Sequence, residues 1–121
     1  MLGILDDVKV IELANGLPGA FAAKLLADQG ADTIKIEPPV LGDATRREPP
    51  FLGGDPNPEQ SSLFLAYNTN KRGITLDIET PTGKDLFLRL AKDTDVIIES
   101  FQPGYLETLG IDFAELNKVN P

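Results

Sequence analysis

Hydrophobic and polar residues alternate along this chain in two kinds of block, which predict strands and helices in turn. Residues 8–13 form a short apolar run typical of a strand, and residues 33–37 show the β-branched, alternating texture of a second strand. Between them lie a turn at residues 15–19 and a helix-length run ending at Gln29. Gly30 is suited to close that helix, because it adopts the left-handed conformation without a steric clash. A strand, a helix and a strand in this order predict two parallel strands joined by a right-handed crossover.

The second half of the chain repeats this alternation. Apolar and polar residues alternate over residues 74–79, which predicts a half-buried strand. Thr80 followed by Pro81 is a typical helix start, with the hydroxyl as the cap. Residues 95–99 have a continuous apolar centre, which is typical of a strand covered on both faces. The sequence therefore predicts an α/β fold, a Rossmann-like parallel sheet with flanking helices.

Shorter segments complete the predicted fold. Residues 61–67 suit a helix or a strand, and we favour the helix; residues 105–109 predict a short helix, and Asp112 is a suitable cap for the last one. Residues 38–58 form a loop rich in proline and glycine, and loops of this length are usually functional or disordered. The alternation still calls for a strand after Pro121, so we expect the sequence to be cut short.

The first predicted helix is apolar on nearly every side. Over residues 19–29 its only polar side chains are Lys24, Asp28 and Gln29. A helix of this composition is normally buried nearly all round, which implies another layer, from either a partner subunit or further sequence. We therefore expect the isolated chain to expose an apolar patch and to associate.

Composition narrows the class of protein and its partners. The 121 residues suit one domain, and 41% apolar with 25% charged residues is ordinary for a globular protein. There is no run of about 18 apolar residues and no N-terminal basic region followed by an apolar one, so we expect no membrane partner and a cytoplasmic location. A net charge of −8 argues against nucleic acid and anionic membranes as partners.

The chain contains no cysteine and no histidine. Disulfides, thiolate nucleophiles and imidazole bases are therefore excluded, as are metal sites built on either residue, and we expect no metal. Acid–base or nucleophilic chemistry from this chain would need Asp, Glu, Lys, Tyr or an activated hydroxyl.

Ligands of parallel sheets gather at the carboxyl ends of the strands, which here are followed by residues 15–19 and 38–47. The first of these turns invites comparison with the dinucleotide fingerprint G-x-G-x-x-G, in which Glu37 would be the ribose-binding acid. Gly16 and Gly19 are present, but Pro18 occupies the place of the glycine that lets the backbone approach a pyrophosphate. This substitution argues against nicotinamide or flavin binding and leaves a structural turn as one interpretation.

Other polar groups have two interpretations each. Residues 68–72 (NTNKR) are either a solvated loop or a site that positions an anion or substrate, and Arg46 and Arg47 carry the same ambiguity. The carboxylates at the strand ends are either acids and bases or solvated and salt-bridged ends; these are Glu12, Glu37 and Glu99. Ser100 and Phe101 follow a buried strand, where a hydroxyl and an aromatic face could meet a nucleotide-like group.

Five blocks of sequence cover nearly the whole chain. They are VKVIELANGLPGAFAAKLLADQGADTIKIEPP, GDATRR, NTNKRGITLDIETPTGKDLFLRLAKDTDVIIESFQPG, YLETLGI and ELNKVNP. Together, and in this order, they resemble the family III CoA-transferases, the group of formyl-CoA transferases, carnitine CoA-transferases and α-methylacyl-CoA racemases.

The resemblance implies an enzyme that moves coenzyme A between carboxylic acids, with acyl-CoA and carboxylic acid substrates. Family members are pairs of interlocked ring-shaped chains, which implies a homodimer. Each chain has a large Rossmann-like domain, and the resemblance implies that residues 1–121 are the N-terminal half of that domain. Their catalytic aspartate forms an acyl anhydride and then a thioester with CoA, chemistry that needs neither histidine nor cysteine. That aspartate lies downstream of the segment matching Pro121, so the resemblance implies no catalytic residue in this chain.

The resemblance also implies which residues line the CoA cleft. They are Leu17, Pro18, Leu76, Asp77, Ile78, Glu79, Ser100, Phe101 and Gln102. Pro38 and Thr108 replace arginines that flank the adenine in formyl-CoA transferases, which removes cation–π stacking on that ring. Ser100 replaces an asparagine that is common in the motif. Adenine recognition is then either lost or taken over by Arg46, Arg47 or Arg72.

Two alternatives remain open at the level of sequence. The first is an acyl-CoA racemase of the same family, which a downstream pair of His and Asp would distinguish from a transferase. The second is a stand-alone, non-enzymatic α/β module that binds a nucleotide or a protein partner, and a monomer with cooperative unfolding would favour it.

Overall fold

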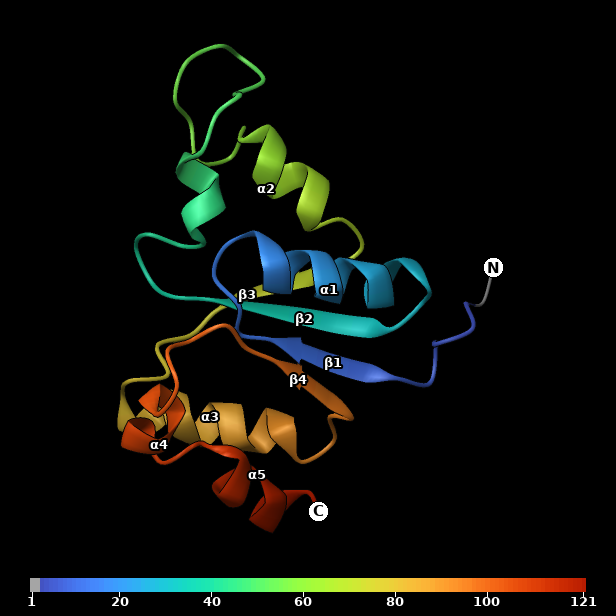
Figure 1. The fold of residues 1–121 in the computed structure, drawn as a ribbon, viewed down its shortest axis with the longest axis vertical. Helices are drawn as coiled ribbons and strands as arrows, with labels where there is room; N and C mark the ends of the chain where they lie inside the picture. Colours follow the sequence, from blue (N-terminus) through green and yellow to red (C-terminus); the bar gives the residue numbers. More distant parts are fainter. Residues whose placement is uncertain (1–2) are drawn as a thin grey trace.

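Four parallel strands form the centre of the computed structural model, which describes residues 3–121 (Figure 1). They are β1 (Lys9–Glu12), β2 (Asp32–Glu37), β3 (Arg72–Thr75) and β4 (Val96–Ile98), in the spatial order β3-β2-β1-β4. Every neighbouring pair is parallel, and Ile11 of β1 lies opposite Ile34 of β2 and Ile97 of β4. The predicted α/β class and the parallel pairing of the first two strands are confirmed.

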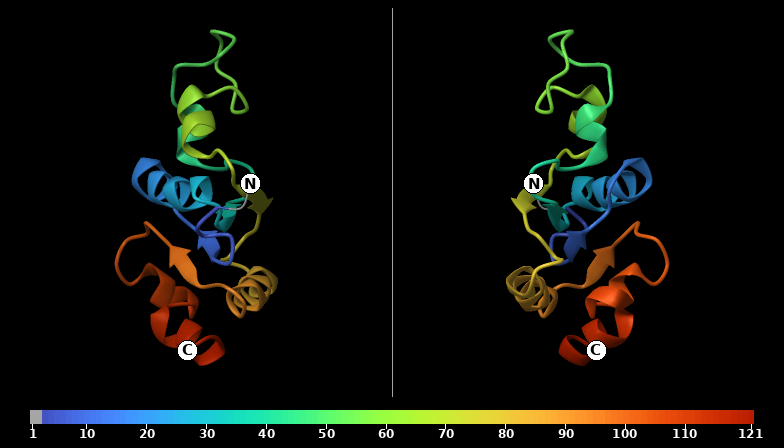
Figure 2. Two further views of the ribbon diagram at one scale, coloured as in Figure 1. Left: turned by 90° about the vertical axis from the view of Figure 1, so that its right-hand side faces the viewer. Right: turned by 90° about the vertical axis from the view of Figure 1, so that its left-hand side faces the viewer.

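Helices cover both faces of this sheet (Figure 1). Helix α1 (Leu17–Asp28) lies on one face, and α3 (Pro81–Ala91), α4 (Tyr105–Leu109) and α5 (Phe113–Val119) lie on the other. The 3-10 helix η1 (Ala44–Arg47) and helix α2 (Ser62–Tyr67) stand at one end of the molecule, and the loop between them projects away from the sheet (Figure 2). Within residues 3–121, no helix combines the length and the apolar character that crossing a membrane would require.

The main apolar core lies between the sheet and α3. Ile11, Leu13 and Ile36 of the sheet region meet Phe87 of α3 and Ile111, which precedes α5. Phe87 and Ile111 are fully buried. Burying a large apolar side chain stabilises a fold by roughly 1.5–3 kcal/mol, so this cluster is what holds α3 and α5 on the sheet.

Helix α1 is buried on one side only. Its small residues Gly19, Ala20, Ala23 and Ala27 pack against the sheet, and Ala20 and Ala23 have no exposed surface. Its larger apolar residues point outward: 47% of Phe21 and 51% of Leu25 are exposed. The helix that the sequence predicts to be buried nearly all round thus has an uncovered apolar side in this chain.

The helix caps follow the sequence signals. The side-chain oxygens of Thr80 and Asp112 accept hydrogen bonds from the amides of Gly83 and Glu115, at 3.0 and 3.1 Å. Ser61 caps α2 in the same way, accepting from the amide of Phe64 at 3.3 Å, and the prediction of a helix there is confirmed. Gly30 has a φ of +106°, as its role at the end of α1 requires.

Two strand predictions need correction. Strand β3 begins at Arg72 and ends at Thr75, so residues 76–79 lie beyond it. Asp77 causes this, because its side chain accepts from the amide of Glu79 and its carbonyl from that of Thr80, which turns the chain into α3. Strand β4 is an edge strand with 37% of Val96 exposed, so it is not covered on both faces.

The helix predictions need smaller corrections. Helix α1 begins at Leu17, within the turn predicted at residues 15–19, so the helix starts earlier than the sequence indicates. The loop at residues 38–58 is partly regular, because it contains η1.

The uncovered side of α1 generates a prediction about association. Replacing Leu25 with lysine places a charge on the apolar side of α1, so we expect weaker self-association with little change in the free energy of unfolding. Sedimentation over a range of concentrations measures the first quantity and urea titration the second. The control is Leu86→Lys on α3, where an exposed leucine (39%) lies across the sheet from α1. A chain that stays monomeric at high concentration before any substitution contradicts the prediction.

Candidate functional site

A cleft of about 420 Å³ opens where the strands end at their carboxyl edge. Each strand contributes the segment that follows it: residues 13–15 after β1, residues 38–40 and Asp43 after β2, residues 76–79 after β3, and Phe101 and Tyr105 after β4. This is the edge at which parallel sheets bind their ligands. The cleft is therefore the main candidate site.

The structure brings five of the nine residues in the sequence-based CoA set into this cleft. Leu76, Asp77, Ile78, Glu79 and Phe101 line it. Leu17 and Pro18 do not, because they lie exposed in the first turn of α1. Gln102 is also exposed, and its backbone carbonyl accepts from the amide of Tyr105 at 3.0 Å.

Ser100 is the remaining member of that set, and its hydroxyl is engaged with the chain itself. It accepts from the backbone amide of Asn15 at 3.0 Å and donates to the carbonyl of the same residue at 3.4 Å. Ser100 does not line the cleft. It joins the segment after β4 to the segment after β1.

Two aromatic residues form one wall of the cleft. The rings of Phe101 and Tyr105 lie 4.8 Å apart between centroids, tilted by 41°. The hydroxyl of Tyr105 donates to Oε1 of Glu79 at 2.6 Å, and this hydrogen bond is the main cause that raises the pKa of Tyr105 to about 12. The sequence indicated Tyr105 only as the start of a helix, although its spacing of four residues from Phe101 is a signal that could have placed it in the site.

Beneath the cleft, on the α1 side of the sheet, four charged side chains form a buried row. Lys71 Nζ lies 2.7 Å from Glu12 Oε2, Lys35 Nζ lies 2.7 Å from Glu12 Oε1, and Lys35 Nζ lies 2.7 Å from Asp43 Oδ2. None of these side chains is more than 2% exposed. The two lysines and two carboxylates balance, so the row is neutral.

This row decides between earlier interpretations of two residues. Glu12 is the salt-bridged strand end rather than a free acid or base, and it is fully buried. The interpretation of Lys71 as part of a solvated loop is wrong, because its ammonium also donates to the carbonyl of Ala20 in α1 at 2.8 Å. Lys71 therefore anchors its loop under α1 and is not available to an external anion.

Burial and ion pairing act in opposite directions on the pKa values of this row. Burial would raise the pKa of Asp43, but the Lys35 ammonium and the hydroxyl and amide of Thr45 outweigh it and hold the pKa below its usual value. Burial lowers the pKa of Lys71, and the neighbouring Glu12 only partly offsets this effect.

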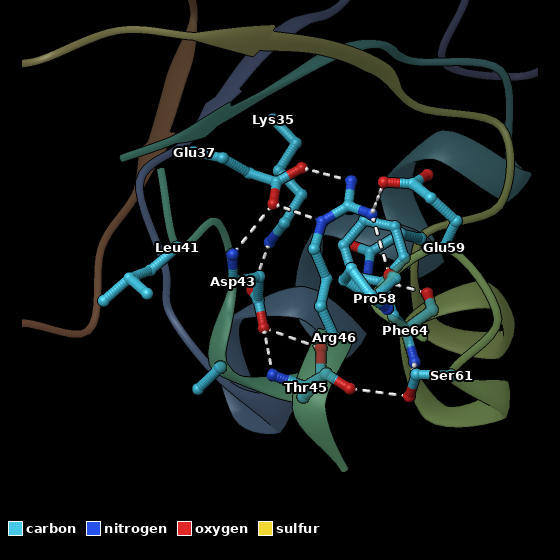
Figure 3. Close-up of polar contacts among 12 residues, drawn as sticks. Lys35, Glu37, Leu41, Asp43, Thr45, Arg46, Pro58, Glu59, Ser61 and Phe64 are labelled. Carbon is cyan, nitrogen blue, oxygen red and sulfur yellow. Dashed lines mark hydrogen bonds and ion pairs between the residues drawn. The ribbon is translucent and has the colours of Figure 1, made fainter. Parts of the chain in front are cut away.

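A separate ion pair, outside this row, fixes the wall that follows β2. Arg46 donates from Nε and NH2 to the two carboxylate oxygens of Glu37, at 2.7 and 2.8 Å (Figure 3). The guanidinium lies 3.7 Å from the centre of the Phe64 ring, and its NH1 donates to the carbonyl of Pro58 at 3.1 Å. Burial would raise the pKa of Glu37, but Arg46 and the amide of Asp43 outweigh it and lower that pKa.

These contacts limit which arginine could meet a ligand. Arg46 is bound to Glu37, and Arg72 is paired with Asp32 at the amino ends of β3 and β2, the edge opposite the cleft. Arg47 makes a single hydrogen bond within residues 3–121, to the carbonyl of Leu41. Of the three arginines that the sequence suggested for adenine, Arg47 has the most donors free.

Two further observations concern the acidic side chains. Glu99 accepts from the amide of Phe101 at 2.7 Å and is exposed, so it stabilises the turn after β4. Across residues 3–121, no three acidic side chains gather in a group that could hold a metal ion.

Comparison with known proteins connects this cleft to one group of enzymes. The model of the CoA-transferase family III matches residues 5–121. An acetyl-CoA:oxalate CoA-transferase from Acetobacter aceti is 40% identical over 98% of this chain and 29% of its own length. A formyl-CoA:oxalate CoA-transferase from Afipia carboxidovorans is 39% identical over 100% of this chain and 28% of its own length.

Solved structures agree with the sequence comparison. A CaiB/BaiF family protein from Brucella suis superimposes with a TM-score of 0.89 at 41% identity, covering 100% of this chain and 32% of that one. A protein from Mycobacterium tuberculosis superimposes with the same score of 0.89 at 36% identity, covering 99% and 32%. The resemblance found in the sequence is confirmed, and the chain spans 27–30% of the length of its first curated relatives.

The ion pair of Glu37 and Arg46 predicts a pH dependence of stability. Because the pKa of Glu37 is lower in the folded chain, its stabilisation is fully present above the ordinary value of 4.5 and is lost as the pH falls through the folded value. We expect Glu37→Gln to lower the free energy of unfolding by about 2 kcal/mol at neutral pH. We also expect the free energy of unfolding of this variant to fall less steeply at acid pH. Urea unfolding at a series of pH values measures both effects.

The matched control for this prediction is Glu59→Gln. Glu59 also contacts Arg46, at 3.2 Å, but 78% of its side chain is exposed. Exposed pairs contribute little, so its removal should leave the profile nearly unchanged. Equal effects of the two substitutions would show that the buried geometry of Glu37 is unimportant.

Gly42 provides an independent test of the same wall. It has a φ of +63°, and a Cβ there would lie 2.7 Å from Glu37 Oε2 and 3.0 Å from Arg46 Cδ. We expect Gly42→Ala to lower the free energy of unfolding more than Gly54→Ala does. Gly54 also has a positive φ, of +84°, but a Cβ there would meet no atom within 4 Å. Urea titration of both variants separates the effect of the steric clash from that of the backbone strain. Equal decreases in the free energy of unfolding would contradict the prediction.

Proposed function

The chain belongs to CoA-transferase family III, and on this basis we propose that it supplies part of the coenzyme A site of an enzyme that moves CoA between carboxylic acids. The observation that carries the proposal is the cleft at the carboxyl edge of the sheet, lined by Leu76, Asp77, Ile78, Glu79 and Phe101. Each of these residues matches a segment to which the family resemblance assigns CoA contact. The proposed site also keeps four residues of the sequence-based set that lie outside the cleft: Leu17, Pro18, Ser100 and Gln102.

The charges of the cleft indicate which parts of CoA it suits. Lys35 and Arg46 neutralise Asp43 and Glu37, but no lysine or arginine of residues 3–121 forms an ion pair with Asp77 or Glu79. These carboxylates would repel the phosphates of CoA. The cleft therefore suits the uncharged parts of the carrier, and the phosphates would lie outside it, where Arg47 is a candidate partner.

In the proposed reaction, a carboxylate of the complete enzyme attacks the carbonyl carbon of an acyl-CoA and forms a mixed anhydride as the CoA thiolate leaves. The thiolate then attacks the enzyme's own acyl carbon, which releases the first acid and leaves an enzyme thioester. The second acid takes the place of CoA through the same two steps in reverse. The attacking aspartate lies outside this chain, whose contribution is to bind and orient CoA.

The names of the curated relatives favour this function over the alternatives. They include enzymes described as acting on oxalate, D-citramalate and glutarate, all as CoA-transferases. A racemase of the same family and a stand-alone binding module are therefore less well supported. The exposed apolar side of α1 supports a further part of the proposal, that this surface is covered in a homodimer of the complete protein.

The proposal predicts that the cleft binds CoA through its apolar lining. Phe101→Ala and Leu76→Ala in the complete protein should each weaken CoA binding by about tenfold, because truncation removes roughly 1.4 kcal/mol of apolar contact. Isothermal titration calorimetry with CoA measures the change. Leu52→Ala, at an exposed leucine (71%) outside the cleft, is the control. Unchanged affinity in both cleft variants would refute the proposed site.

A further inference from the structure

The short turn at residues 14–16 follows β1 and forms hydrogen bonds with β2, with the segment after β2 and with the segment after β4. Lys35 Nζ donates to the carbonyl of Ala14 at 3.3 Å, and the side-chain oxygen of Asn15 accepts from the amide of Ala44 at 2.7 Å. The amide of Gly16 donates to Asp43 Oδ2 at 3.4 Å. Each residue of the turn is thus tied to β2 or to the segment that follows it.

Asp43 is the main holding group on the β2 side. Its side chain is 1% exposed and contacts Lys35 Nζ at 2.7 Å and the amide and hydroxyl of Thr45 at 2.8 and 2.6 Å (Figure 3). It also accepts a hydrogen bond from the amide of Gly16. With its oxygens occupied in this way, the carboxylate is not free to contact a ligand. Since burying a charge is costly, an ion pair in this position fixes one arrangement of the segments that it joins.

Ser100 is the holding group on the β4 side. Its hydroxyl forms both of its hydrogen bonds with the backbone of Asn15, and the next residue, Phe101, forms the aromatic wall. The distance between this wall and the segment after β2 therefore depends on the turn at residues 14–16, held by Asp43 from one side and by Ser100 from the other.

We propose that Asp43 and Ser100 are positioning residues that set the width of the cleft through the turn at residues 14–16. Their polar groups act through this turn, because the Asp43 carboxylate and the Ser100 hydroxyl make their hydrogen bonds within the chain. This inference rests on the proposed CoA site, because it needs a ligand that the walls of the cleft enclose. It goes beyond that site in assigning the fit of the ligand to one hydroxyl and one carboxylate that are hydrogen-bonded within the chain.

The test measures CoA affinity by calorimetry and stability by urea titration, both on the complete protein. Ser100→Ala and Asp43→Asn should each raise the Kd for CoA by roughly three- to tenfold, the range of a lost hydrogen bond of about 1 kcal/mol. Ser100→Thr, which keeps the hydroxyl, should retain the affinity. In a protein that carries both Ser100→Ala and Asp43→Asn, the increase in Kd should be smaller than the product of the two single increases, since both residues act through the same turn.

The matched control is Ser61→Ala. Ser61 is fully buried, and its hydroxyl forms two hydrogen bonds, with the carbonyls of Thr45 and Glu48, at 2.6 and 2.7 Å. It lies outside the cleft, so its loss should lower stability and leave the Kd for CoA unchanged. Because Ser100 is exposed, Ser100→Ala should fold even if Asp43→Asn does not.

The outcomes separate this inference from the proposed function. If Phe101→Ala weakens CoA binding and Ser100→Ala does not, the positioning role is refuted and the site stands. The inference is also refuted if Ser61→Ala raises the Kd as much as Ser100→Ala, since a general loss of stability would then explain both. If Phe101→Ala and Leu76→Ala leave CoA binding unchanged, the site and the positioning role fall together.

Discussion

The buried row of Lys71, Glu12, Lys35 and Asp43 is the interaction on which the arrangement of this structure depends. It joins the loop before β3, the end of β1, the middle of β2 and the loop after β2, which are separated in sequence by up to 59 positions, from 12 to 71. Breaking a buried pair by removing one partner leaves an uncompensated charge and costs about 3–5 kcal/mol. An apolar core would tolerate small shifts between these segments, whereas the paired charges define one set of distances.

The two faces of the sheet are consequently stabilised in different ways. The face under α3 is held by Ile11, Ile36 and Phe87, where the free energy depends on the buried area rather than on direction. The face under α1 carries the charged row and is covered by small side chains. Two members of the charged row, Lys35 and Asp43, also form hydrogen bonds with the turn at residues 14–16 of the cleft. The contacts that stabilise this face of the sheet therefore also position part of the candidate site.

Much of the fold follows from the sequence because its signals are local. The caps at Thr80 and Asp112 and the glycine after α1 act within a few residues, and each was predicted correctly. The apolar blocks predicted the four strands in the right order, although not all of their bounds. The strand before α3 was predicted to end too late, because apolar and polar residues still alternate to residue 79 although the chain turns at Asp77. The buried state of Lys71 could not be predicted, because its partner Glu12 is remote in sequence and composition alone places lysine in solvent. For the same reason the sequence showed Ser100 as a residue near a ligand but not its bonds to Asn15.

The close seating of α1 has a consequence for how this protein can change over evolutionary time. Ala20 presents its methyl group to the sheet while its carbonyl receives the Lys71 ammonium at 2.8 Å. A larger residue there would push the helix outward and withdraw the acceptor from an ammonium group whose side chain is only 2% exposed. A charge on another segment thus favours small side chains at position 20, and the tolerance of that position depends on the residue at position 71.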